Sequence, residues 1–192
     1  MGIATAGRSE ADMQNIVGMF VNMLPVKAQP IEYKTFAAFL KEVHEIVLKA
    51  YENQDYPYEE LIKKMKLQRH PGRDPLIDAA FTRHDFDYEA SARTMQETGD
   101  LKITPYPYEP GNSNFLLDLE FTEADEKIDL RLRYFANVFK ESTVRAITQH
   151  YLEILKQIIG NINILLKDIK ISSHLEGSRK DILVGIDKEF DF

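Results

Sequence analysis

The sequence has no cysteine among its 192 residues. A disulfide framework and a thiolate metal site are therefore both excluded. An Asn-X-Ser/Thr sequon, the acceptor of N-linked glycans in secreted proteins, is also missing. These absences favour a cytoplasmic protein.

An excess of basic residues is missing as well. Lys and Arg number 24 against 31 Asp and Glu, which gives a formal net charge of -7, and no basic cluster interrupts the acidic background. Sequence-independent binding to nucleic acid depends on such clusters, because it neutralises phosphates. We therefore expect no nucleic-acid partner.

No apolar run is long enough to cross a membrane. The longest, Ile16 to Leu24, is interrupted by Asn22 and stopped by Pro25, and it is far shorter than the roughly 20 residues that a membrane-spanning helix needs. The first four residues also lack the basic start, apolar stretch and cleavage pattern of a signal peptide. We expect neither a membrane association nor a targeting role for this start.

A self-contained catalytic motif is absent too. The five histidines are scattered without zinc-binding spacing, and the closest two, His70 and His84, lie fourteen residues apart. There is no nucleophile elbow, and Gly72-Arg73-Asp74-Pro75 is too short for a phosphate loop. His44 and His150 fall within helical patterns, where a surface role is favoured over catalysis.

One combination of residues resembles a set of metal ligands. His84, Asp85 and Asp87 lie together at the end of a predicted strand and would suit a divalent ion. Strand alternation, however, places Asp85 on the face opposite His84 and Asp87. A hydrated strand end is therefore the favoured interpretation, and we expect no metal site.

The spacing of apolar residues predicts a mixed α/β fold in which a mixed sheet packs against amphipathic helices. We expect helices over residues 36–50, from Pro57 onward and over 142–160. We expect strands over residues 16–24, 77–84, 115–122 and 128–134, and a short one over 169–171. The apolar run 16–24 is also compatible with a buried helix. Residues 86–113 are polar and punctuated by Pro and Gly, which predicts irregular structure.

The segments 115–122 and 128–134 alternate apolar and charged residues around a polar turn, which indicates a β-hairpin. Pairing them would place Asp118 and Glu120 on the polar face that Arg131 and Arg133 also occupy. These charges therefore have a structural explanation as cross-strand pairs.

Four segments match a known order of motifs. Ala6-Gly7-Arg8 precedes a stretch, Ile16 to Lys27, that matches Gly-x-Phe-Val-Asn-Thr-Leu-Pro with Met23 in place of Thr. Asn53 to Leu61 matches Gln-Asp-Tyr-Pro-Phe-Glu, with Asn53 where His is common and Tyr58 in place of Phe. Arg73 to Asp78 looks like a shortened Arg-Asp-x-Ser-Arg-Asn-Pro-Leu, and Leu132 to Phe139 follows Leu-Arg-Tyr-x-x-x-x-Phe. In this order the segments resemble the later half of the condensation domains of nonribosomal peptide synthetases.

The resemblance implies a single chloramphenicol-acetyltransferase-like lobe, the C-terminal, mainly acceptor-side lobe of a two-lobed domain. Such domains form amide bonds between thioesters carried by partner proteins, in a tunnel between the lobes. The family's catalytic histidine belongs to a His-His-x-x-x-Asp-Gly motif of the first lobe, which this sequence lacks. We therefore expect no catalytic residue here and no activity from the chain alone.

The expected partners and boundaries follow from the same resemblance. The partners are the N-terminal lobe of the domain, peptidyl carrier proteins that bear 4'-phosphopantetheine, and a neighbouring adenylation domain. The chain itself is expected to bind no cofactor directly. The resemblance places the lobe at residues 1–171, a candidate bridge to the first lobe at 86–114, and the start of a linker to an adenylation domain at 172–192.

Four residues are candidates for contact with substrate or tunnel. Asn22 is an amide in an apolar strand, so it would either orient pantetheine or satisfy neighbouring backbone. Phe20 belongs to the same motif. For Asp55 and Tyr56, capping the helix that begins near Pro57 is favoured over substrate contact.

Two alternatives remain open. The lobe would either contribute to amide formation or act as a noncatalytic lobe that docks carrier or adenylation domains. Within the family, a lobe from a cyclisation, epimerisation or lipid-initiating domain also fits, although the Phe-Val-Asn-x-Leu-Pro motif favours ordinary condensation.

Overall fold

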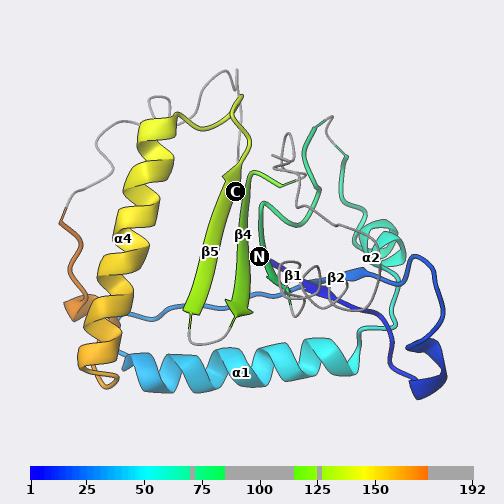
Figure 1. Cartoon of the computed structure of the whole chain (residues 1–192), viewed down its shortest axis with the longest axis horizontal. Helices are drawn as coiled ribbons and strands as arrows, with labels where there is room; N and C mark the ends of the chain where they lie inside the picture. The colour runs from blue at the N-terminus through cyan, green and yellow to red at the C-terminus, as the bar shows by residue number, and fades with distance from the viewer. Residues whose placement is uncertain (70–71, 85–114, 125–126, 173–192) are drawn as a thin grey trace, which may run out of the picture.

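The computed structural model describes residues 1–69, 72–84, 115–124 and 127–172. Its strands form one mixed sheet in the order β2-β1-β3-β4-β5 (Figure 1). They are β1 (Gly2–Thr5), β2 (Asn22–Pro25), β3 (Ala79–His84), β4 (Leu117–Ala124) and β5 (Lys127–Tyr134). The three central strands are parallel, and each edge strand pairs with its neighbour in the antiparallel sense. The predicted mixed α/β fold is confirmed.

An apolar row crosses all five strands on one face of the sheet. Strand register aligns, in order, Leu24, Ile3, Phe81, Leu119 and Leu132. The N-terminal part of this row packs against half-buried residues of helix α1 (Phe36–Glu52). This contact forms a hydrophobic core, and it explains why the apolar spacing of α1 was a reliable signal.

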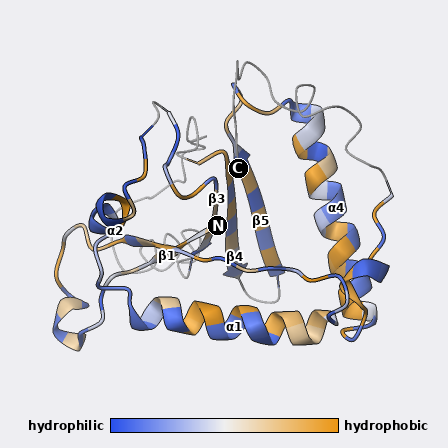
Figure 2. Cartoon of the chain, turned by 180° about the vertical axis from the view of Figure 1, so that it is seen from behind, coloured by the Kyte–Doolittle hydropathy of each residue, from blue (hydrophilic) through white to orange (hydrophobic). Residues whose placement is uncertain are grey.

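The helices largely confirm the sequence expectation. α1 begins after Thr35, whose side-chain oxygen accepts a hydrogen bond from Ala38 N at 3.2 Å. α4 (Glu141–Gly160) stands steeply across α1 and beside the β4–β5 hairpin (Figure 1). Both helices carry apolar stripes along one side (Figure 2). No helix in the described ranges is long and apolar enough to cross a membrane.

His44 and His150 differ in burial. His44 is exposed, as expected. His150 is only 8% exposed, so the expectation of a surface role is wrong for this residue. It lies on the side of α4 that also buries Thr143 and Ile158.

Backbone hydrogen bonds join the segment after α4 to the start of α1. Residues 162–167, after α4, exchange hydrogen bonds with residues 32–37 at the start of α1, among them Phe36 N to Ile164 O at 2.8 Å. This pairing includes a bridge between Thr35 and Leu165. The C-terminal part of the described chain is thereby tied to the beginning of α1.

The predicted short strand at 169–171 is wrong. The chain forms the 3₁₀ turn η2 (Leu166–Asp168), and the backbone of Lys170 is then held by the Gln157 side chain, with hydrogen bonds of 2.6 and 2.9 Å. Glu153 accepts a further hydrogen bond from Ser172 N at 2.8 Å. The hydrogen bonds from Ser172 and Gln149 lower the pKa of Glu153 to about 2. Side chains of α4 therefore bind the backbone of this segment, in place of the neighbouring strand that a β-strand would require.

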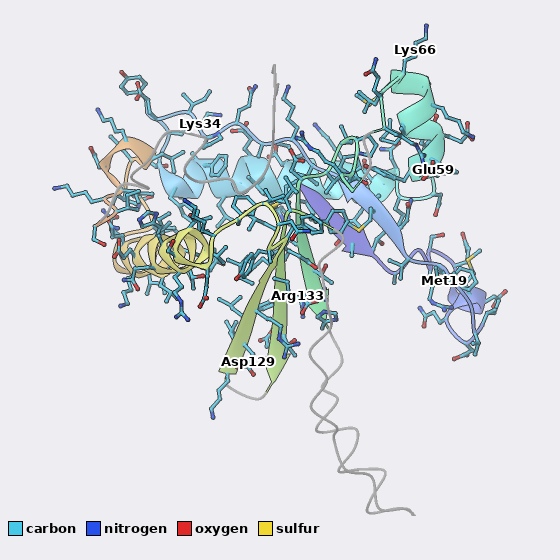
Figure 3. The ribbon with its side chains drawn as sticks, turned by 90° about the horizontal axis from the view of Figure 1, so that it is seen from above. Met19, Lys34, Glu59, Lys66, Asp129 and Arg133 are labelled. Atoms are coloured by element: carbon cyan, nitrogen blue, oxygen red, sulfur yellow. The ribbon has the colours of Figure 1, made fainter. Side chains whose placement is uncertain are left out.

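The strand predicted over 16–24 is wrong in its first part. Only residues from Asn22 onward pair with β1, because β1 ends at Thr5, opposite Asn22. The residues before it are exposed except for the half-buried Phe20, and both Val17 and Met19 are 100% accessible. Figure 3 shows Met19 at the edge of the molecule, away from the sheet. An apolar run predicts burial only where a partner element is long enough to cover it.

Candidate functional site

Three of the four predicted site residues line one cavity of about 500 Å³, which we call the polar groove. It is formed by Gly7 and by residues 20–23, 54–55 and 57–59, so Phe20, Asn22 and Asp55 belong to it. These segments come from the end of β1, the start of β2 and the connection from α1 to α2 (Tyr58–Met65). The fold therefore brings together residues that the sequence separates by more than thirty positions.

Asn22 connects two walls of the groove. Its side-chain Nδ2 donates hydrogen bonds to Gln54 O at 2.8 Å and to Tyr56 O at 3.2 Å. Its Oδ1 accepts a hydrogen bond from Met23 N at 3.0 Å. Both amide protons are thus used by backbone, which fixes the loop before α2 against β2.

The end of β1 adds two more contacts to this loop. Thr5, which is 8% exposed, donates a hydrogen bond through its Oγ1 to Gln54 Oε1 at 2.7 Å. Ser9 donates through Oγ to Asp55 Oδ1 at 3.3 Å. The Asp55 carboxylate therefore points toward the β1 side of the groove.

Gly7 is required by the shape of the groove. Its φ of +61° is left-handed, and a Cβ at this position would lie 1.8 Å from Phe20 O. The guanidinium carbon of Arg8 lies 4.2 Å from the centre of the Phe20 ring, in cation–π contact. Only glycine permits the close approach that places Phe20 over Arg8.

The predicted capping role of Asp55 and Tyr56 is wrong. The N-cap of α2 is Pro57, one residue before the helix, and no side chain makes a cap hydrogen bond there. Glu59 and Glu60 in the first turn complement the helix dipole instead. Asp55 and Tyr56 are therefore left to other contacts.

Tyr56 lies on a neighbouring cavity of about 660 Å³, which we call the apolar cavity. It lies between β2, the C-terminal half of α1 and α2, and most of its lining is aliphatic. Of its described lining residues, only Lys49 and Lys64 are charged. Because no carboxylate lines it, its electrostatic character is opposite to that of the polar groove.

Tyr58 connects α2 to the loop before β3. Its hydroxyl donates to Asp74 Oδ1, which also accepts from Leu76 N at 2.9 Å and Ile77 N at 2.7 Å. Burial, followed by the bond to Asp74, raises the pKa of Tyr58 above its ordinary value. Arg73 and Asp78 close the same loop with two hydrogen bonds of 2.8 Å.

A second polar cluster lies on the hairpin, where the charges pair across the strands as predicted. Arg133 Nη2 lies 2.7 Å from Asp118 Oδ2, and Arg133 also contacts Glu120. Their face is not fully solvated, however: Asp118 is 4% exposed, whereas Ile128 on the apolar side is 61% exposed. Strand register flanks Asp118 with the small residue Ala80. Desolvation by burial raises the pKa of Asp118, although Arg133 acts against that shift.

His84 is the one described member of the weak metal combination. Its Nε2 lies 3.7 Å from Glu120 Oε1, while Asp85 and Asp87 lie outside the described residues. Among the residues described, no group of three or more His, Asp or Glu has the arrangement of a metal site.

The two cavities can bind and orient a ligand. The polar groove offers an amide, a carboxylate and backbone groups, and the apolar cavity offers an aliphatic surface. Among the residues that the structure describes, neither is lined by a histidine that would act as a general base. Positioning is therefore the chemistry that the described site supports.

Sequence reasoning missed several lining residues. Gln54, Met23 and Tyr58 line the groove, yet they were not chosen. A signal was present for two of them, because Met23 and Tyr58 are departures from the motifs in which they stand. Gln54 gave no signal, since its contact with Thr5 depends on the fold alone.

Comparison with known proteins identifies consistent relatives. The family model described as Condensation domain matches residues 1–180. The chain is 36% identical over 190 residues to tyrocidine synthase 3 of Brevibacillus parabrevis, covering 99% of this chain and 3% of that protein. It is 38% identical over 186 residues to gramicidin S synthase 2 of Brevibacillus brevis, covering 96% of this chain and 4% of that protein. It thus spans only a small part of these relatives.

Solved structures show the same fold. A four-domain nonribosomal peptide synthetase bound to AMP and glycine aligns with a TM-score of 0.78 at 16% identity, over 92% of this chain and 14% of that one. The X-domain in complex with OxyB from teicoplanin biosynthesis aligns with a TM-score of 0.70 at 19% identity, over 90% of this chain and 38% of that one. The chloramphenicol-acetyltransferase-like fold expected from the motifs is confirmed.

Proposed function

The chain belongs to the condensation-domain family, and on that premise we propose that it is the C-terminal, acceptor-side lobe of an amide-forming domain in a nonribosomal peptide synthetase. In this function a carrier-bound aminoacyl amine attacks a carrier-bound thioester: an amide bond forms, the C–S bond breaks, the donor's pantetheine thiol leaves, and the growing peptide moves to the acceptor. The lobe supplies one wall of the tunnel. A first lobe supplies the catalytic histidine.

The observation that carries this proposal is that hydrogen bonds link three family-like segments, two of which line the polar groove. Asn22, from the first segment, donates to the backbone of residues 54 and 56 in the second. Tyr58, in the second, donates to Asp74 in the third. Segments separated along the chain thus form one structural unit, as expected if they shape a common binding site.

The role of this unit is to position the acceptor. Bringing two bound reactants into reactive alignment supplies a large part of such a rate enhancement. Phe20, Asn22 and Asp55 would line the acceptor arm's path, with Tyr56 at the adjoining cavity. Because Asn22 already satisfies backbone groups, we assign it to holding the groove's shape rather than to hydrogen bonding with pantetheine.

The partners follow from this role. We propose a first lobe, carrier proteins bearing 4'-phosphopantetheine, and an adenylation domain joined through residues 172–192, all in the cytoplasm. The lobe would extend over residues 1–171. Its candidate bridge, residues 86–114, lies outside the described residues and stays a prediction.

Reconstitution tests the proposal. The chain would be joined to the first lobe of tyrocidine synthase 3, and dipeptide formation from two loaded carrier proteins would be followed by mass spectrometry. We expect product from the joined protein and none from the chain alone. In the joined protein, Asn22→Ala and Asp55→Asn should raise KM for the acceptor carrier more than they lower kcat.

The controls make the outcome decisive. Asn15→Ala changes an exposed asparagine that lines neither cavity, and it should leave both kinetic constants unchanged. A folded, joined protein that forms no dipeptide would reject the catalytic proposal. Product from the chain alone would show that it has a catalytic residue of its own.

A second function is favoured by one comparison. The X-domain shares this fold, and its structure was solved in complex with OxyB. A lobe of this kind would dock another protein without forming amide bonds. In the reconstitution, binding of a carrier or adenylation domain without product would favour this alternative. The identity of the first lobe would further separate cyclisation, epimerisation and lipid-initiating relatives.

A further inference from the structure

The polar groove and the apolar cavity are neighbours that share two lining side chains, Met23 and Tyr58. Both residues depart from the family's sequence motifs, which have Thr at the position of Met23 and Phe at the position of Tyr58. Two of the departures of this chain from the family's motifs therefore lie between its two cavities.

Met23 is held in place by the sheet beneath it. It pairs with Ala4 across β1 and β2. A Cβ built on Gly2 would lie 2.9 Å from Met23 Cε and 2.8 Å from Ile77 Cδ1. The end of the methionine side chain thus packs over β1 beside Ile77, in a space that only glycine leaves open.

Tyr58 is anchored to the same place by a different route. Its hydroxyl binds Asp74, and Asp74 accepts a hydrogen bond from Ile77 N. Ile77 is 1% exposed, the most fully buried large side chain in the described structure. Both shared side chains are therefore linked to Ile77: Met23 lies beside its side chain, and Tyr58 reaches its backbone N–H through Asp74.

The cavities on the two sides would select different groups. Asp55 and Glu59 line the polar groove, whereas the charged residues described around the apolar cavity are Lys49 and Lys64. An apolar side chain would gain from entering the apolar cavity. A cationic side chain would be repelled there by the two ammonium groups.

We propose that Met23 and Tyr58 are specificity-determining residues, which separate the polar groove from the apolar cavity and so restrict the acceptor to small side chains. This inference rests on the proposed function, since it takes the groove as the acceptor's site. Shortening Met23 to the family's Thr would join the two cavities. The joined site would then admit a bulky apolar side chain but not a cationic one.

Binding of defined probes to the chain itself tests the inference. The probes are alanyl-, leucyl- and lysyl-pantetheine with an amide in place of the thioester, and binding is followed by NMR titration. The unaltered chain should prefer the alanyl probe. Met23→Thr should raise the affinity ratio of leucyl to alanyl probe by about tenfold, the usual effect of accommodating a few methylene groups. The lysyl probe should gain nothing.

Three further variants control the test. Met19→Thr makes the same change at a fully exposed residue that lines neither cavity, and it should leave the ratio unchanged. Met23→Leu keeps the volume, so it should keep the preference for the alanyl probe. Tyr58→Phe removes only the hydroxyl and should shift the ratio in the same direction as Met23→Thr, by a smaller factor.

The outcomes separate this inference from the function beneath it. Binding of the alanyl probe with an unchanged ratio in a folded Met23→Thr and in Tyr58→Phe would overturn the separation of the cavities and leave the proposed function standing. Failure of the unaltered chain to bind any probe, or binding that Asn22→Ala and Asp55→Asn do not weaken, would overturn the groove as acceptor site and the inference with it.

Discussion

Two polar clusters in this chain stabilise strands in opposite ways. At the β2 edge, neutral Asn22 donates both amide protons to backbone oxygens and leaves a cavity open beside it. On the β4–β5 hairpin, Arg133 is held between Asp118 and Glu120, and Asp118 Oδ1 and Arg133 Nε are buried with no hydrogen-bond partner among the described residues. The neutral cluster is satisfied, whereas the ionic cluster depends on all of its members.

The comparison teaches where each cluster is vulnerable. A buried ion pair is weak evidence for stability, because desolvation offsets attraction, yet removal of one partner leaves an uncompensated charge. A neutral hydrogen bond contributes less and costs less when it is lost. The ionic cluster should therefore be the more sensitive of the two.

The largest effect is expected when the ionic cluster on the β4–β5 hairpin is disrupted. Arg133→Met leaves Asp118 and Glu120 as neighbouring carboxylates, and we expect it to lower the free energy of unfolding by about 3 to 5 kcal/mol. Urea denaturation of the chain measures this loss. Arg131→Met is the matched control, because Arg131 is 70% exposed and lies 3.9 Å from Glu120, so it should cost less than about 1 kcal/mol. Equal losses in the two variants would contradict the burial argument.

The next effect concerns the backbone at Gly7, which lines the polar groove together with Asn22. Gly7→Ala forces a Cβ against Phe20 O at a left-handed φ, and we expect a loss of about 2 to 4 kcal/mol from strain and overpacking together. Gly72→Ala separates the two causes, since Gly72 has a φ of +76° but no atom within 4 Å of its Cβ position. It should show only the conformational part, about 1 to 2 kcal/mol. Thermal unfolding would compare them, and a milder effect at Gly7 than at Gly72 would exclude the clash.

A smaller effect is expected when the hydrogen bonds of the Asn22 side chain are removed. Asn22→Ala leaves Gln54 O and Tyr56 O without their donor, and the expected loss is about 1 to 2 kcal/mol. Hydrogen exchange should rise in residues 54–58 and remain unchanged in β4. The exposed Asn15→Ala serves as reference. Loss of protection throughout the sheet would mean that Asn22 supports the whole core rather than one loop.

The smallest effect is a difference in pH dependence between the clusters. The pKa of Asp118 is raised in the folded state above its ordinary value of 3.8, so the folded state binds the proton more tightly than the unfolded state. The stability of the unaltered chain relative to Asp118→Asn should therefore fall as the pH rises through 3.8 and level off above the folded-state pKa. Relative to Asn22→Ala it should not change over this range, because asparagine does not titrate. Denaturation at several pH values would show whether only the ionic cluster responds.

Helices and strands were predicted best where the apolar residues of one element pack against a single partner element. α1, α4 and the hairpin were predicted correctly, because their apolar periodicity corresponds to real burial. The exposure of Met19 could not be predicted, since it depends on where β1 ends. The burial of Asp118 was equally hidden, because alternation shows which residues share a face but not which face is covered.

That the candidate site residues contact substrate stays a prediction, but most of them do lie together. Motif order identified Phe20, Asn22 and Asp55, which do line one groove. It placed Tyr56 with them, although Tyr56 lines the adjoining cavity. The bond between Tyr58 and Asp74 lay beyond reach, because a contact between residues sixteen apart has no local sequence signature.

The position of β1 in the sheet has a consequence for how the lobe is synthesised. Although β1 lies at the very start of this chain, it is an inner strand, between β2 and β3. It can pair with β2 early, but its other edge must wait until Ala80 and Phe81 have been translated. Until then the nascent lobe presents an unpaired apolar strand edge, a state prone to aggregation. Slow translation through residues 26–78 would prolong that exposure, so this interval is where a chaperone would protect the growing chain.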